Sequence, residues 1–170
     1  MKSEGSILVV DDDVVLCELL CDAFTMSNYT CTAVQSGEAA LELMNREKFD
    51  FMLTDVVMPG MSGFALTEHV KQQHPGTEVL MMTGFSQEDS CQKAIAAGAA
   101  DFIIKPFKIE ELLARIERVK HNARTLAEIR QREHALVNMS REMIASIKGE
   151  ARNTQKTLEQ EIARLRKTLT

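Results

Sequence analysis

The sequence predicts an α/β protein: a five-stranded parallel sheet, doubly wound, followed by a long α-helical extension. In the first part of the chain, short apolar runs of strand length alternate five times with helical patterns. This alternation is typical of a parallel sheet that is covered by helices on both faces. The turn formers predict the extension, because all 3 prolines and every glycine except Gly149 precede residue 113.

Five runs rich in β-branched and other apolar residues are the predicted strands. They span residues 7–10, 30–34, 49–55, 78–84 and 101–107. The third run stops at Asp55, because Pro59 and Gly60 follow closely and this pair turns the chain.

Helices are predicted between these strands, where apolar residues recur at helical spacing. They span residues 14–24, 38–46, 62–74 and 87–97, and a fifth begins at residue 109. Asp13 is a predicted N-cap of the first helix. Pro75 and Gly98 are the predicted stops of the third and fourth.

Polar side chains stand at the carboxyl ends of four of the predicted strands. Asp11, Asp12 and Asp13 follow the first strand, Asp55 ends the third, Thr83 lies near the end of the fourth and Lys105 near the end of the fifth. In an open parallel sheet these ends meet at one edge, and ligands bind in the crevice beyond it. We therefore expect these residues to form one site, with Asp55 at its centre.

The residue types predict phosphoryl chemistry at that edge. Crowded carboxylates raise one another's pKa unless a cation joins them, and hard oxygen ligands suit Mg²⁺. Lys105 supplies a cation and Thr83 a hydroxyl for phosphoryl oxygens. Because a carboxylate is a competent covalent acceptor, the pattern indicates a metal-assisted aspartyl-phosphate site.

Residues 1–122 resemble the receiver domain of bacterial two-component response regulators. Four motifs carry the resemblance, in order and at the predicted strand ends. They are Ile-Leu-Val-Val-Asp-Asp-Asp at 7–13, Thr-Asp-Val-Val-Met-Pro-Gly-Met-Ser-Gly at 54–63, Met-Thr-Gly at 82–84 and Lys-Pro-Phe at 105–107. The resemblance implies the flavodoxin-like receiver fold, and a phosphorylation-controlled switch that catalyses only its own phosphorylation and dephosphorylation.

The resemblance also implies roles for single residues. Asp55 would accept a phosphoryl group from a sensor histidine kinase or a phosphotransfer protein. The implied Mg²⁺ ligands are Asp12, Asp55 and the carbonyl of Val57, with Asp11 acting through a metal-bound water. Lys105 would hold a phosphoryl oxygen. Thr83 would move toward the phosphoryl group, and the ring of Phe102 would follow it.

Two alternative functions are compatible with parts of the pattern. Asp11 and Asp13 also fit the nucleophile and the acid/base of haloacid-dehalogenase-type phosphatases. However, a helical pattern begins at Val14, where that fold has a flap, and Lys105 is followed by Pro106 instead of leading to a further acidic pair. The second alternative is a DNA-binding regulator whose output domain is missing from this chain.

Residues 123–170 are the predicted helical coiled-coil tail. A heptad seam begins before them, with apolar residues at Leu112, Ile116, Val119, Ala123 and Leu126. The seam blurs over residues 130–134. It resumes, in steps of four, four and three, at Met143, Ile147, Ala151, Thr154, Leu158, Ile162, Leu165 and Leu169. Such a seam needs another helix, and a second copy of the chain is the simplest partner, so we expect a homodimer that signals to an unknown downstream protein.

The charge of the tail does not favour nucleic-acid binding. Residues 113–170 hold 13 Lys and Arg against 7 Asp and Glu, a net +6, whereas residues 1–112 hold 7 against 18, a net −11. The positive residues are spread around the predicted helix and no aromatic residues interleave with them. Residues 138–143 resemble the box around the phosphorylated histidine of sensor kinases, but Arg141 stands where the histidine would be.

The remaining composition indicates a cytoplasmic protein that does not enter the membrane. No apolar run is long enough to span a bilayer, and the first residues do not form a signal peptide. The cysteines, Cys17, Cys21, Cys31 and Cys91, form no CxxC pair and no zinc spacing. We expect them to be small buried apolar residues and not a redox pair.

Overall fold

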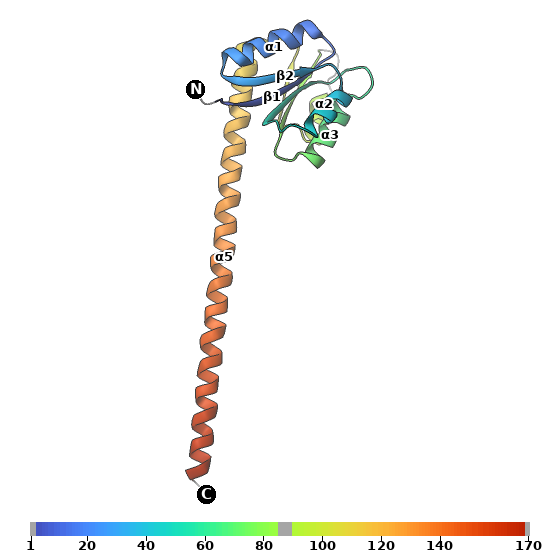
Figure 1. Ribbon diagram of the computed structural model, residues 1–170. Coiled ribbons are helices and arrows are strands. Elements are labelled where there is room, and N and C mark those ends of the chain that lie inside the picture. The colour runs from blue at the N-terminus through green and yellow to red at the C-terminus, as the bar shows by residue number, and fades with distance from the viewer. Residues whose placement is uncertain (1–2, 85–89, 169–170) are drawn as a thin grey trace. The chain divides into compact units, whose positions relative to one another are not determined.

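The computed structural model describes residues 3–84 and 90–168, leaving aside the side chains of residues 90, 91 and 168. The elements are β1 (Gly5–Val10), α1 (Val14–Met26), β2 (Tyr29–Val34), α2 (Gly37–Met44), β3 (Phe51–Asp55), α3 (Gly63–Gln73), β4 (Glu78–Thr83), α4 (Ser90–Ala96), β5 (Asp101–Ile104) and α5 (Ile109–Thr168). The strands form one parallel sheet in the order β2-β1-β3-β4-β5 (Figure 1). The predicted fold class is thereby confirmed.

The sheet buries apolar side chains on both faces, as a doubly wound fold requires. On one face, α1 and the beginning of α5 contribute buried residues such as Leu20 and Leu112 to a cluster with β1, β3 and β4. On the other face, α2, α3 and α4 contribute Ala40, Leu66 and Ala94. Successive strand residues alternate between these two clusters, so both faces of every central strand are apolar.

Several element ends differ from the predicted ones. Strand β5 ends at Ile104 and not at residue 107, because Pro106 has no N–H with which to continue the ladder. The predicted start of the fourth helix, Gln87, lies outside the described residues, and α4 is described from Ser90. The Asp13 cap is confirmed, since its carboxylate accepts hydrogen bonds from the N–H groups of Val15 and Leu16.

The first part of the expected heptad seam is corrected. Leu112, Ile116 and Val119 are buried in the cluster beneath α1, at 4 % exposure or less, so they belong to the core of the sheet domain. A helix that covers a sheet and a helix in a coiled coil share the same apolar spacing. Spacing alone therefore could not tell the two apart.

The chain divides into two units, Met1–Ala123 and Arg124–Thr170. In the second unit every described side chain is exposed. The apolar ones include Leu136, Met143, Ile147, Leu158 and Ile162, each about half exposed or more. Among the described helices of both units, none combines the length and apolar character needed to cross a membrane.

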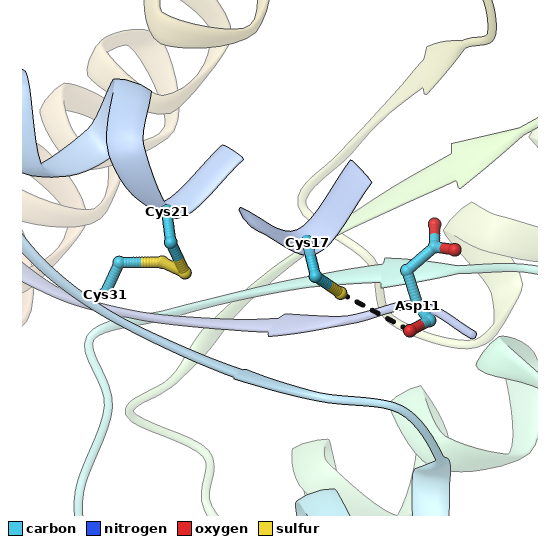
Figure 2. The surroundings of a disulfide bond; sticks show 4 residues. All are labelled: Asp11, Cys17, Cys21 and Cys31. Carbon is cyan, nitrogen blue, oxygen red and sulfur yellow. Dashed lines mark hydrogen bonds between the residues drawn. A yellow bond between two sulfur atoms is a disulfide. The ribbon is translucent and has the colours of Figure 1, made fainter. Parts of the chain in front are cut away.

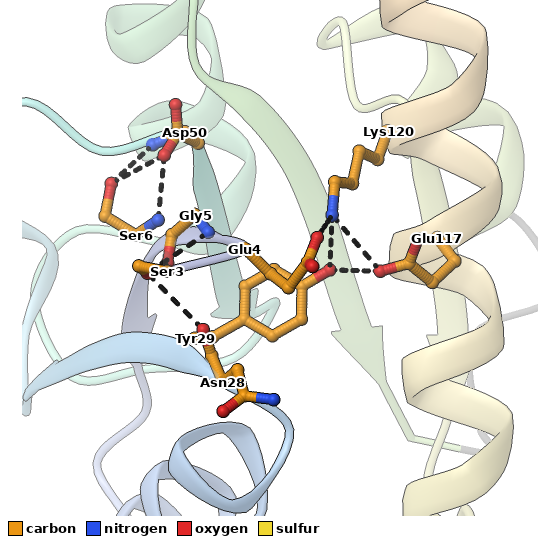
Figure 3. A network of polar contacts seen from close by, with 9 residues as sticks. All are labelled: Ser3, Glu4, Gly5, Ser6, Asn28, Tyr29, Asp50, Glu117 and Lys120. Atoms are coloured by element: carbon orange, nitrogen blue, oxygen red, sulfur yellow. Dashed lines mark hydrogen bonds and ion pairs between the residues drawn. The ribbon is translucent and has the colours of Figure 1, made fainter. Parts of the chain in front are cut away.

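A polar cluster fixes the start of α5 to the amino-terminal edge of the sheet (Figure 3). The Tyr29 hydroxyl donates to Glu117, and the Lys120 ammonium donates to Glu4 and lies over the Tyr29 ring, 5.2 Å from its centroid. Burial raises the pKa of Tyr29 to about 12, and the hydrogen bond to Glu117 raises it as well. A lysine that is only 7 % exposed is tolerated here because these groups surround its charge.

The expectation that no cysteines pair is wrong. Cys21 of α1 and Cys31 of β2 form a disulfide, with their Cα atoms 5.2 Å apart (Figure 2). The chain reverses near Asn28, which adopts a φ of 64°, and β2 then runs back beneath α1. This return brings together two cysteines separated by 10 positions, a relation that no local spacing rule contains. Cys17 is a buried free thiol.

Candidate functional site

The strand register brings the predicted site residues to one edge of the sheet. Asp11 directly follows β1, whose last residue, Val10, is paired with Thr54. Asp55 is paired with Met82, the residue before Thr83. Thr83 is in turn paired with Ile104, directly before Lys105. Residues from four distant parts of the chain therefore lie at the carboxyl edge.

Lys105 joins two carboxylates at this edge. Its Nζ donates to Oδ2 of Asp11 at 2.7 Å and lies 3.2 Å from Oδ1 of Asp55. The Asp11 side chain is 2 % exposed and that of Asp55 13 %. The other oxygen of Asp11 accepts the N–H of Asp13 at 2.9 Å, so this carboxylate is held at both oxygens.

The charges at this edge act on one another. Burial raises the pKa of Asp55, although the ammonium of Lys105 acts in the opposite direction. For Lys105, burial lowers the pKa, but the hydrogen bond to Asp11 and the charge of Asp55 outweigh it, and the net shift is upward. Lys105 therefore stays protonated, and one cation faces two carboxylates.

A third carboxylate completes a group that could hold a metal ion. One oxygen each from Asp11, Asp12 and Asp55 lies within 4.8 Å of the others. Asp11 is buried whereas Asp12 is exposed, so the group opens toward solvent. Hard carboxylate oxygens on an open site are a donor set that fits Mg²⁺, which keeps several waters. Val57, the other predicted ligand, lies in the adjoining loop with a largely exposed side chain.

Thr83 and Phe102 occupy positions of different exposure. Thr83 is 4 % exposed, and its hydroxyl donates to the carbonyl oxygen of Gly84 at 3.4 Å. Phe102 is partly buried and packs against the cluster on the α2–α3–α4 face. These contacts of Thr83 and Phe102 do not involve Asp55, so the switching role of the two residues is a proposal.

Two residues that the sequence analysis did not assign shape the loop after Asp55. Gly63 begins α3, and a Cβ atom built there would lie 2.0 Å from the carbonyl oxygen of Asp55. The carboxylate of Glu38 accepts the N–H of Met61 at 3.0 Å and holds the loop from the side of α2. A glycine at a helix start, directly after the Ser62 cap, was the one available signal.

The geometry does not support the phosphatase alternative. The carboxylate of Asp13, the proposed acid/base, is used to cap α1 at 3.0 and 3.1 Å. Helix α1 begins at Val14, directly after the acidic residues. The position where that fold needs a flap is therefore occupied by a regular helix.

Comparisons with known proteins agree with this geometry. The family model of the response regulator receiver domain matches residues 7–117. The transcriptional regulator NtrC of Escherichia coli K12 is 40 % identical over 114 residues, which are 67 % of this chain and 24 % of that protein. FleR of Pseudomonas aeruginosa is 38 % identical over 114 residues, which are also 67 % of this chain and 24 % of that protein. The chain thus spans about a quarter of the length of the curated relatives it matches.

Solved structures of response regulators are also similar to this chain. NtrX of Brucella abortus, solved in complex with ADP, superposes with a TM-score of 0.68 at 30 % identity, over 74 % of this chain and 28 % of that one. The chemotaxis response regulator CheY4 of Vibrio cholerae superposes with a TM-score of 0.64 at 30 % identity, over 68 % of this chain and 98 % of that one.

Proposed function

Because this chain belongs to the receiver-domain family of two-component response regulators, we propose that Asp55 accepts a phosphoryl group from a sensor histidine kinase or a phosphotransfer protein. The observation that carries the proposal is the position of Lys105 between the carboxylates of Asp11 and Asp55. An ammonium beside a nucleophilic carboxylate neutralises charge on an incoming phosphoryl group. The chain is then a switch and not a turnover enzyme.

Mg²⁺ is the cofactor that the donor set fits, with Asp11, Asp12, Asp55 and the carbonyl of Val57 as the proposed ligands, Asp11 acting through a water. When bound, the ion neutralises negative charge on the phosphoryl oxygens. It would also offset the repulsion among carboxylates that a single lysine faces. The exposure of Asp12 leaves this side of the site open to solvent.

The chain's own groups have distinct parts in the transfer. One oxygen of Asp55 bonds to phosphorus while the bond from phosphorus to the histidine nitrogen breaks. Lys105 exchanges part of its contact with Asp55 for a phosphoryl oxygen and keeps its hydrogen bond to Asp11. The Thr83 hydroxyl turns from the Gly84 carbonyl toward the phosphoryl group, and Phe102 moves into the space it leaves.

Labelling with a small phosphodonor tests the acceptor. Incubation with acetyl phosphate and Mg²⁺ should add one phosphoryl group, which hydroxylamine removes as it removes other acyl phosphates. Asp55→Asn should abolish the label, and Lys105→Ala should slow its formation. Asp13→Asn serves as the matched control and should still be labelled. Label that persists in Asp55→Asn but is lost in Asp11→Asn would establish the phosphatase reading instead.

The two-part organisation is also a proposal, with a receiver at residues 1–122 and a coiled-coil tail at 123–170. The exposed apolar side chains of the second unit support it, because such a row is stabilised by burial against another helix. We propose that the other helix is the tail of a second copy. Phosphorylation would then change the surface that the dimer presents to a downstream protein.

A second candidate, a role in transcription control, is favoured by the names of the relatives. NtrC is described as a DNA-binding transcriptional regulator. We propose that the tail of this chain does not contact DNA directly. In the relatives, DNA binding would then belong to regions that the match with this chain does not cover. Gel-shift titration tests this: binding to duplex DNA that survives moderate salt would contradict it. We also propose a cytoplasmic location, because a relative that is described as DNA-binding acts where the bacterial DNA is.

A further inference from the structure

The disulfide between Cys21 and Cys31 is a feature that the proposed phosphoryl site does not explain. It joins the second turn of α1 to the edge strand β2 (Figure 2). The Cα separation of 5.2 Å lies within the range that disulfides adopt, so the backbone is already placed for the bond.

Helix α1 and strand β2 have other contacts that hold them in the fold. Helix α1 is anchored by Cys17, Leu20 and Phe24, each 1 % exposed or less. Strand β2 is paired with β1 along its whole length, from Gly5 opposite Tyr29 to Val10 opposite Val34. We therefore expect both elements to keep these contacts when the two sulfurs are separate thiols.

The three described cysteines differ in how well a reagent can reach them. Cys21 and Cys31 are partly buried at the rim of the apolar cluster. Cys17 is 1 % exposed, and its Sγ donates to the carbonyl oxygen of Asp11 at 3.4 Å. Exchange chemistry is therefore directed to the pair and not to its neighbour.

We propose that Cys21 and Cys31 form a reversible thiol–disulfide site that reacts with small-molecule or protein thiols. In the reductive direction a thiolate attacks one sulfur and forms a mixed disulfide, and a second thiol releases it. Two external thiols are oxidised to one disulfide while Cys21 and Cys31 each gain a proton. The inference rests on the cytoplasmic location proposed above, where a persistent structural disulfide is rare and those that occur are usually redox-sensing or catalytic.

The bond has a route to the acidic edge through α1. The helix begins at the Asp13 cap, whose N–H is bonded to Asp11, and Cys17 holds the Asp11 carbonyl one turn before Cys21. Tying α1 to β2 therefore restrains the segment that presents Asp11 and Asp12. We expect α1 amides to exchange more slowly in the oxidised form, on the order of tenfold or more.

The experiment uses the full-length variant Cys17→Ser/Cys91→Ser, which keeps only the pair. The protein is equilibrated in a series of glutathione buffers that runs from reducing to oxidising. Each sample is quenched with acid and alkylated, and its mass is measured by mass spectrometry. The expected result is a reversible passage from two alkylated thiols to none, in a monomer-mass species lighter by two hydrogens. Hydrogen exchange of α1 is then compared at the two ends of the series.

Matched variants separate the pair from nonspecific oxidation. Adding Cys21→Ser or Cys31→Ser to this background should leave the remaining thiol alkylatable, apart from a glutathione adduct. The proposal is overturned if both thiols of the pair stay alkylatable in oxidising buffer, or if only disulfides between chains form. A bond that survives reducing glutathione in the folded protein overturns it too. No readout involves Asp55, so failure of phosphorylation and failure of this proposal are distinguishable.

Discussion

Lys105 is the side chain on which the electrostatics of the carboxyl edge depend. Its ammonium has one carboxylate at 2.7 Å and a second at 3.2 Å, while the exposed Asp12 adds a third negative charge to the group. One cation cannot balance three carboxylates, so the site retains negative charge that a divalent cation would offset. Burial raises the pKa of Asp55, which is the expected sign for a carboxylate that lacks full compensation.

Asp12 and Asp13 are neighbours with different predicted roles, and paired substitutions separate them. Asp13→Ala should destabilise the fold by about 0.5–2 kcal/mol, because α1 loses its N-cap. It should leave Mg²⁺ affinity nearly unchanged. Asp12→Ala should do the reverse, since its oxygen belongs to the carboxylate group. Isothermal titration with MgCl₂ and urea denaturation measure the two quantities, and equal losses of affinity in both variants would refute the division.

Tyr29 offers a direct measurement of a single pKa, because it is the only tyrosine in the chain. Titration of tyrosinate absorbance should give a value of about 12, above the ordinary 10.0. Glu117→Gln should lower the pKa, because this carboxylate raises it, and Lys120→Met should raise it further, because the ammonium lowers it. A titration near the ordinary value in the folded protein would contradict the cluster in Figure 3.

The raised pKa of Tyr29 also makes the free energy of unfolding depend on pH. The folded state holds the phenolic proton more tightly than the unfolded chain does, so this contribution is complete below pH 10 and is lost as pH rises toward about 12. Tyr29→Phe should therefore remove part of the alkaline decline in the free energy of unfolding. Urea denaturation across this pH window measures the difference between the two proteins.

Helix α3 approaches β3 so closely that its first residue has to lack a side chain. Gly63→Ala would place a Cβ 2.0 Å from the carbonyl oxygen of Asp55, so α3 or the loop has to shift. We expect a loss of about 1–3 kcal/mol in the free energy of unfolding and slower labelling of Asp55 by acetyl phosphate. Chemical denaturation and the labelling assay provide the two readouts.

Gly149→Ala is the matched control for that substitution. Gly149 lies inside α5, and beyond its chain neighbours and the adjacent backbone of the same helix no atom lies within 4 Å of an added Cβ. The same change should there favour the helix by about 0.5–1 kcal/mol and leave labelling unaffected. If both substitutions had the same effect on labelling, the close approach at Gly63 would not be what positions Asp55.

The sequence was sufficient to predict the succession of strands and helices along the chain, because apolar runs, caps and prolines act locally. It also predicted that Asp11, Asp55, Thr83 and Lys105 meet, since a parallel sheet brings its carboxyl ends together. It did not predict that Lys105 contacts Asp11 more closely than Asp55, a matter of side-chain packing across the edge. The Cys21–Cys31 bond was missed for a related reason, because only the return of β2 beneath α1 creates it.

The tail shows a different limit of inference from sequence. Leu112, Ile116 and Val119 continue with Ala123 and Leu126 in one heptad spacing, yet the first three are core residues of the sheet domain. The spacing reports only that one side of a helix is apolar, and not what covers it. From Leu126 onward every described apolar side chain is exposed, so these later residues are the ones for which we propose a partner helix.

At the scale of the whole molecule, the two units carry opposite net charge and differ in whether their apolar side chains are buried. Residues 1–123 contain the buried apolar clusters, whereas the described side chains of residues 124–167 are exposed, and we propose that association with a second copy buries the apolar ones. A receiver that dimerises through such a tail needs only a differential of a few kcal/mol between tail arrangements to transmit its phosphorylation state. The dimer is therefore the property to test first.

Truncation after Asn122 should leave labelling of Asp55 intact and convert a dimer largely to monomer, because it removes the exposed apolar residues of the tail and retains the buried ones of α5. A full-length test avoids the change in size: Ile162→Asp places a charge in the apolar row, whereas Gln160→Asp adds the same charge on another side of the helix. Light scattering at micromolar concentration should find Ile162→Asp shifted toward monomer and Gln160→Asp unchanged. An unsubstituted chain that is monomeric under these conditions would refute the dimer. Equal shifts in both variants would show that charge, and not the apolar row, controls association.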